Sequence, residues 1–107
     1  MFTRSAIFEG AIRPGKEDAF YKVIEEDLLA IWRRMPNVLD VRLFRPVAQD
    51  PGTPSILMVQ QIDYPSLEAI DEAMASPERD EAVVASEPLA DLYDGRHYHF
   101  VYDKVTG

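Results

Sequence analysis

The chain has 107 residues, of which 47% are hydrophobic and 28% charged, the size and composition of one globular domain over residues 1–107. Its formal net charge of -8 disfavours contact with phosphate backbones and anionic lipid, so we expect neither nucleic acid nor membranes among its partners. The chain has no cysteine, which excludes disulfides, thiolate metal ligands and cysteine nucleophiles. Without a signal-peptide pattern or an apolar run of about 18 residues, a cytoplasmic location is expected.

The first part of the chain predicts two strands separated by one long helix. Residues 3–12 are rich in β-branched and aromatic side chains and stop at Arg13-Pro14-Gly15, as a strand would. Between residues 16 and 35 apolar side chains recur at steps of three and four, which indicates one buried helical face. They are Phe20, Val23, Ile24, Leu28, Ile31, Trp32 and Met35. Pro36-Asn37 ends this helix, and residues 38–45 predict a second strand.

A third strand and a second helix follow a polar connection over residues 46–54. Residues 55–63 form the most strand-like stretch of the chain. Ser66, just after Tyr64-Pro65, is expected to cap a helix, because a serine hydroxyl can accept a hydrogen bond from a free backbone N–H of the first turn. The buried stripe of this helix is predicted to be Leu67, Ile70 and Met74.

The remaining residues predict a second helical piece and a last strand. Ser76-Pro77 restarts a helix as cap and first-turn proline, and Pro88 interrupts it. Asp94-Gly95 is expected to form the final turn, before a strand over residues 96–103. The order strand, helix, strand, strand, helix, strand is typical of the ferredoxin-like α+β fold, a four-stranded antiparallel sheet with both helices on one face.

Apolar residues occur on both faces of this predicted sheet. Residues 56–59 are apolar without a break, and Leu43 and Phe44 are adjacent. On the last strand, three aromatic residues alternate with the two histidines: Tyr98, Phe100 and Tyr102. A sheet face open to water would alternate to polar side chains, so we expect a second copy of the chain to cover it in a homodimer. The alternative is that some of these side chains are solitary surface hydrophobes.

Three short segments and the order of the elements along the whole chain resemble the dimeric α+β barrel superfamily, in particular its EthD-like and antibiotic-biosynthesis-monooxygenase-like branches. The segments are Arg13-Pro14-Gly15-Lys16-Glu17, Tyr64-Pro65-Ser66-Leu67-Glu68-Ala69-Ile70 and Ala75-Ser76-Pro77-Glu78. The resemblance implies a homodimer whose two sheets face each other, with a small-molecule pocket between the sheet and helices of each subunit. The superfamily includes cofactor-free monooxygenases, lactone isomerases, dye-type peroxidases and haem-degrading enzymes, so the fold alone does not decide the function.

Asp27 is the first candidate for acid–base chemistry. It falls inside the apolar stripe of the first helix, three residues after Ile24 and four before Ile31. A carboxylate at such a position is expected to be buried against the sheet, with a pKa away from about 3.9, and could act as a general acid or base. The alternative is that it lies at the edge of the stripe and reaches solvent or an arginine.

His97 and His99 are the only histidines, and their spacing places them on one face of the last strand. Histidine transfers protons readily at neutral pH, so the pair is a candidate catalytic site, which we expect to line the same cavity as Asp27. No third ligand at a matching spacing supports a metal site. Haem is not expected either, because the haem-degrading relatives use a helical histidine, and no other cofactor is predicted. The alternative is an exposed edge strand or a dimer contact.

Three further residues are candidates for binding a substrate. Trp32 could stack on a planar ligand, as could the aromatic residues Tyr21, Tyr98 and Tyr102, although aromatic side chains at such spacings commonly belong to the core. One amide of Gln60-Gln61 must face inward in either register, where it could orient a ligand or hold the hairpin. Arg4 on the first strand could pair with a carboxylate.

Two functions are compatible with these residues. The first is a small cofactor-independent enzyme, monooxygenase-like or isomerase-like, in which His97, His99 or Asp27 moves a proton of a hydrophobic aromatic or polyketide-like molecule. The second is a non-catalytic homodimer that binds a small hydrophobic ligand. The sequence has no phosphate-binding glycine loop and no nucleophile elbow, which disfavours nucleotide and serine-hydrolase chemistry.

Overall fold

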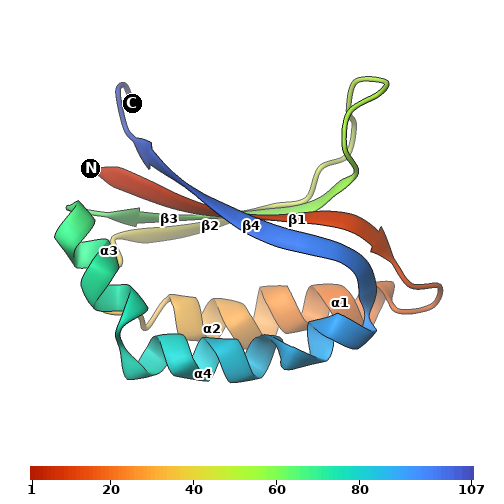
Figure 1. Ribbon diagram of the computed structural model, residues 1–107, viewed down its shortest axis with the longest axis horizontal. Helices are drawn as coiled ribbons and strands as arrows, with labels where there is room; N and C mark the ends of the chain where they lie inside the picture. Colours follow the sequence, from red (N-terminus) through yellow and green to blue (C-terminus); the bar gives the residue numbers. More distant parts are fainter.

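The computed structural model describes residues 1–107 and contains one antiparallel sheet of four strands (Figure 1). The strands are β1 (Phe2–Ile12), β2 (Asp40–Phe44), β3 (Ile56–Tyr64) and β4 (Tyr93–Asp103). Their order across the sheet is β2-β3-β1-β4, so the last strand lies beside the first. This is the arrangement predicted for a ferredoxin-like α+β fold, and the prediction is confirmed.

The helical segments cover one face of the sheet (Figure 1). The first is a continuous run of α1 (Glu17–Lys22), the π-helical turn η1 (Val23–Leu28) and α2 (Leu29–Trp32). The second runs through α3 (Leu67–Met74), α4 (Pro77–Ser86) and the 3-10 helix η2 (Glu87–Asp91). Both predicted caps are present: the Ser66 hydroxyl accepts from the Ala69 amide at 3.0 Å, and the Ser76 hydroxyl accepts from the Arg79 amide at 3.2 Å. No helix combines the length and the apolar character needed to cross a membrane.

The core lies between the sheet and these helices. All seven apolar residues predicted for the first helix are buried, as are Ala6, Phe8, Met58 and Ile62 from the sheet. In α3 the predicted stripe is partly wrong, because Leu67 is exposed and the buried residues are Ala69, Ile70 and Ala73. Leu67 stands at the first position of the helix, where its side chain faces solvent.

The expected turn at Asp94-Gly95 is wrong, because both residues belong to β4. Asp94 is paired with Ala11 and Gly95 with Gly10, at the far end of β1. A Cβ atom on Gly95 would overlap the carbonyl oxygen of Glu9. Strands β1 and β4 therefore approach each other so closely that only glycine fits at position 95. The long β1 keeps its partner in register up to Ile12, and this pairing replaces the turn that the local Asp-Gly pattern favours.

The other face of the sheet, which we call the outer face, carries no helix (Figure 1). Its central apolar residues, by register, are Ile7, Val59, Tyr98, Phe100 and Tyr102. Phe100 is 48% and Tyr102 40% exposed in the single chain. The side chains of Tyr98, Phe100 and Tyr102 on β4 therefore point away from the helices.

Candidate functional site

A cavity of about 680 Å³ lies between the sheet and the helices. The residues that line it come from β1, β3 and β4 on one side and from η1, α2, α4 and η2 on the other. Phe8, Leu28, Trp32 and Leu89 supply apolar surface. Small-molecule sites typically have volumes of about 300–1,000 Å³ and mix apolar walls with a few polar groups. The cavity therefore has the size and composition of a binding site for a compact organic molecule.

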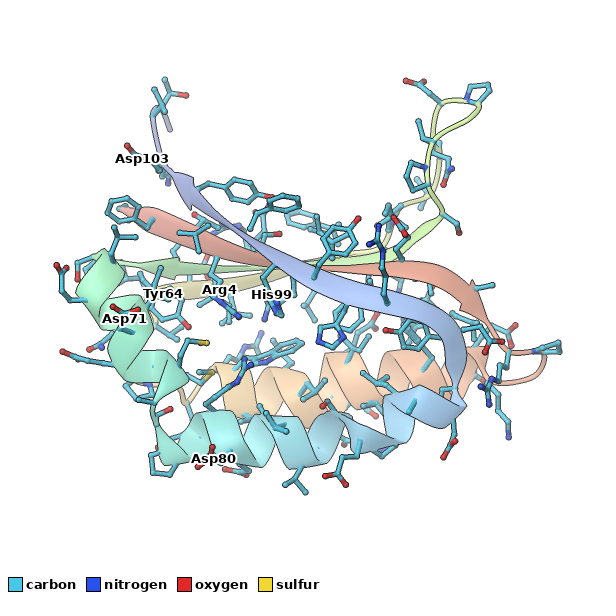
Figure 2. The ribbon with its side chains drawn as sticks, viewed as in Figure 1. Arg4, Tyr64, Asp71, Asp80, His99 and Asp103 are labelled. Carbon is cyan, nitrogen blue, oxygen red and sulfur yellow. The ribbon has the colours of Figure 1, made fainter.

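Both histidines point into this cavity from β4, on the face opposite to Tyr98, Phe100 and Tyr102, as the alternation of side chains along a strand requires. His97 is exposed at the cavity mouth and stacks on Phe8, with ring centroids 5.6 Å apart. His99 is half-buried deeper in the site, and its ring meets that of His97 edge-on at 5.6 Å. In Figure 2, His99 lies beside Arg4 in the space between the sheet and the helices.

The surroundings of His99 disfavour its charged form. Burial is the largest cause, and the positive charges of Arg4, His97 and Arg79 add repulsion, so the pKa of His99 falls from 6.5 to about 4. The imidazole is therefore neutral at physiological pH and has a free lone pair. A neutral histidine in a cavity can accept a proton from a bound molecule.

Two arginines of the cavity have no carboxylate partner. Arg4 comes from β1 and Arg79 from α4, and neither side chain forms an ion pair or a hydrogen bond within the protein, whereas Arg13, Arg34 and Arg45 are all bound to carboxylates. Burial, followed by the charge of Arg79, lowers the pKa of Arg4 from its ordinary value. The two guanidinium groups thus give this part of the cavity a positive potential.

Two polar side chains near these arginines also lack partners. Gln60 lines the cavity, is only 2% exposed, and its Oε1 atom accepts no hydrogen bond. Tyr64 lies on the same face of the sheet, close to Arg4 in Figure 2, and its fully buried hydroxyl has no partner either. Burial raises the pKa of Tyr64 above 10.0, so the phenol keeps its proton. Buried polar groups are normally paired, which makes an unpaired amide on a cavity wall a candidate ligand contact.

Asp27 lies outside the cavity, and its predicted burial is wrong. Its side chain is 47% exposed and accepts a hydrogen bond from Lys22 at 3.3 Å. The π-helical turn over residues 23–28 is the physical reason: residues five apart share a face there, so Asp27 stands over Lys22 at the helix surface. An ordinary α-helix would have placed Asp27 among Ile24 and Ile31. The expectation that a histidine and Asp27 share one cavity is therefore also wrong.

The structure gathers most of the other predicted site residues in one place. Five line the cavity, namely Arg4, Trp32, Gln60, His97 and His99. Tyr21 does not line it and packs under the Arg45 guanidinium at 3.8 Å. The sequence pattern did not single out Arg79, although it stands three residues before Ala82, the buried residue of α4, and so shares its face. No third histidine, aspartate or glutamate joins the two histidines in a metal-binding cluster.

Comparison with known proteins supports the fold assignment. Neither a protein-family model nor the sequence of a curated protein matches the chain. An EthD family protein from Bacillus halodurans has a similar structure, with a TM-score of 0.75 at 15% identity over 96% of this chain and 98% of that one. An antibiotic biosynthesis monooxygenase gives a TM-score of 0.66 at 19% identity, covering 99% of this chain and 100% of that one. The predicted resemblance to these two branches is confirmed at the level of the fold.

Two further structures share this fold. SnoaB, described as a cofactor-independent oxygenase from Streptomyces nogalater, gives a TM-score of 0.63 at 20% identity over 95% of this chain and 92% of that one. A protein of unknown function from Bacteroides fragilis, described as dimeric with a ferredoxin-like fold, gives 0.64 at 12% identity over 95% of each chain. At these identities the similarity establishes a common fold.

Proposed function

We propose that this protein is a small cofactor-independent enzyme that removes a proton from a hydrophobic aromatic or polyketide-like molecule bound in the cavity. The observation that carries the proposal is the neutral, half-buried imidazole of His99, which lies beside Arg4 in a cavity with apolar walls. The similarity in fold to a cofactor-independent oxygenase supports it. The anion formed in this step would then react with molecular oxygen in a monooxygenation, or take a proton back at another position in an isomerisation.

In the proposed step, the substrate bound against Trp32 gives an acidic proton to the free nitrogen of His99. An imidazolium and a substrate anion form together, so the total charge of the cavity stays the same. The low pKa of His99 makes the imidazolium costly in the empty cavity. A new negative charge next to Arg4 offsets the repulsion from the neighbouring cations, so the proton transfer costs less when substrate is bound. Gln60 can hydrogen-bond the substrate and fix its orientation.

His97 has a different proposed role, because it is exposed at the cavity mouth. Its ring lies 5.6 Å from that of His99 and reaches solvent. This position suits a residue that passes the proton between His99 and water. We therefore expect its removal to slow the reaction and the removal of His99 to stop it.

Hydrogen–deuterium exchange tests proton removal on its own, independently of any later oxygenation or isomerisation. An enolisable bicyclic ketone such as 2-tetralone is incubated with the protein in D₂O, and loss of its acidic C–H signal is followed by NMR. The protein should accelerate the exchange, His99→Gln should abolish the acceleration, and Asp27→Asn should retain it. Oxygen consumption with anthrone-like substrates would then distinguish oxygenation from isomerisation. A ligand that binds in the cavity with no acceleration of exchange would instead establish the non-catalytic binding function.

We also propose that two copies associate through the outer face. Phe100 and Tyr102 expose aromatic surface there, and a protein of this fold is described as dimeric. Light scattering after size exclusion should give twice the mass of one chain at micromolar concentration. Phe100→Glu should give a single chain, and Val84→Glu, at a 63% exposed position of α4, should leave the dimer intact. A wild-type mass of one chain would refute the proposal.

A further inference from the structure

The charges in the cavity are opposite to those of the whole molecule. The chain has a formal net charge of -8 and nineteen Asp and Glu residues, yet none of their carboxylates binds Arg4 or Arg79. The acidic residues of the cavity lining are Glu87, which is exposed, and Asp94, which is bound to Arg13 at 3.0 Å. Asp80, next to Arg79, lies on the side of α4 away from the sheet (Figure 2). Two half-buried cations are therefore left without a counter-ion.

Such an arrangement is costly unless a ligand completes it. Partly desolvated guanidinium groups that repel each other destabilise a protein when no anion compensates them. A bound anion between Arg4 and Arg79 would remove this repulsion and satisfy their N–H donors. The unpaired Oε1 atom of Gln60, a residue 2% exposed on the same cavity wall, independently offers an acceptor to a hydrogen-bond donor elsewhere on the ligand. Apolar residues form the adjoining wall, so the anion belongs to a molecule that is otherwise hydrophobic.

We infer that the substrate is a hydrophobic carboxylic acid whose carboxylate is held between Arg4 of β1 and Arg79 of α4, with its ring system against Trp32. This inference rests on the proposed function and specifies its substrate class. A carboxylate is favoured because guanidinium groups match its planar geometry. It also needs fewer donors than a phosphate, which suits a cavity whose unpaired donors come from two arginines.

Ligand pairs that differ only in charge test the inference. The probes are 2-naphthoate, its methyl ester and 2-naphthyl phosphate, and binding is measured by calorimetry. Hydrogen bonds to charged groups correspond to about tenfold or more in affinity, so 2-naphthoate should bind at least about tenfold more tightly than the ester. Arg79→Met should remove this preference, and Arg79→Lys should restore part of it. Arg33→Met, which removes an exposed arginine just after α2, should leave it unchanged.

Thermal unfolding without ligand separates a binding role from a structural one. If Arg79 serves to bind an anion, the empty Arg79→Met protein should melt at the same temperature as the wild type or higher, because an unpaired charge has been removed. A lower melting temperature together with unchanged preference for 2-naphthoate would show a structural role and overturn the inference.

The other outcomes separate this inference from the proposed function. Equal binding of 2-naphthoate and its ester, with His99 resonances shifted by both, would overturn the carboxylate site and leave the proton-transfer function standing. Tighter binding of 2-naphthyl phosphate than of 2-naphthoate would also overturn it, in favour of a phosphate ester. If none of the three probes shifts the His99 resonances at millimolar concentration, the carboxylate site is refuted. The exchange assay with 2-tetralone would still decide the proposed function.

Discussion

The neutral state of His99 should be visible in the pH dependence of stability. The folded protein lowers the pKa of this histidine from 6.5 to about 4, through burial first and then through the charges of Arg4, His97 and Arg79. Between these pH values the unfolded chain binds a proton that the folded chain does not. The contribution of His99 is therefore fully present above pH 6.5 and is lost as the pH falls towards 4.

The size of this effect can be worked out from the two pKa values. Between pH 7.5 and 4.5 the linkage amounts to about 2.5 kcal/mol, and partial exposure of the ring reduces it to about 2 kcal/mol. Urea unfolding at both pH values, at one fixed protein concentration, measures it. With a typical slope of about 1–3 kcal/mol per molar urea, the urea midpoint should fall by roughly 0.7–2 M more in the wild type than in His99→Gln.

His97→Gln is the matched control, on the same strand and the same face. Burial is the largest cause of the lowered pKa of His99, and the charge of His97 ranks below that of Arg4, so this variant should keep most of the dependence. Equal losses of stability in the wild type and in His99→Gln would refute the reasoning. They would mean that the folded protein tolerates a charged His99, and the proposal that His99 acts as a neutral base would lose its support.

Three further predictions concern other parts of the molecule. Hydrogen bonds from Arg42 are the main reason that the pKa of Asp63 falls from 3.8 to about 2. Asp63→Asn should therefore lower the free energy of unfolding at pH 7 by about 2 kcal/mol. In the wild type, urea titrations should show this contribution being lost as the pH falls from 3.8 through 2. Gly95→Ala should lower the free energy of unfolding by about 3 kcal/mol or more, because its Cβ would overlap the β1 backbone; a normal melting temperature would contradict the pairing. Asp27→Asn should change the free energy of unfolding by less than about 0.5 kcal/mol, since the ion pair with Lys22 is exposed, and a large loss would argue for a buried role.

The sequence by itself determined the order of the elements, the buried face of the first helix and the parity of the last strand. These are short-range properties: caps such as Ser66 and Ser76, the spacing of apolar side chains, and the alternation of a strand depend on neighbours within a few residues. His97 and His99 had to share one face in any ferredoxin-like sheet. The sequence left open which face that is.

Only the tertiary structure decided which charged groups meet. The π-helical turn moved Asp27 out of the stripe, and no local pattern marks such a turn. The pairing of Gly10 with Gly95 replaced a turn that the local residues favour. Arg4 and Arg79 face one cavity although they lie far apart in the sequence, because β1 and α4 pack on opposite sides of it. Periodicity shows which side of an element is buried, whereas the electrostatics of a site depend on partners that only long-range packing brings together.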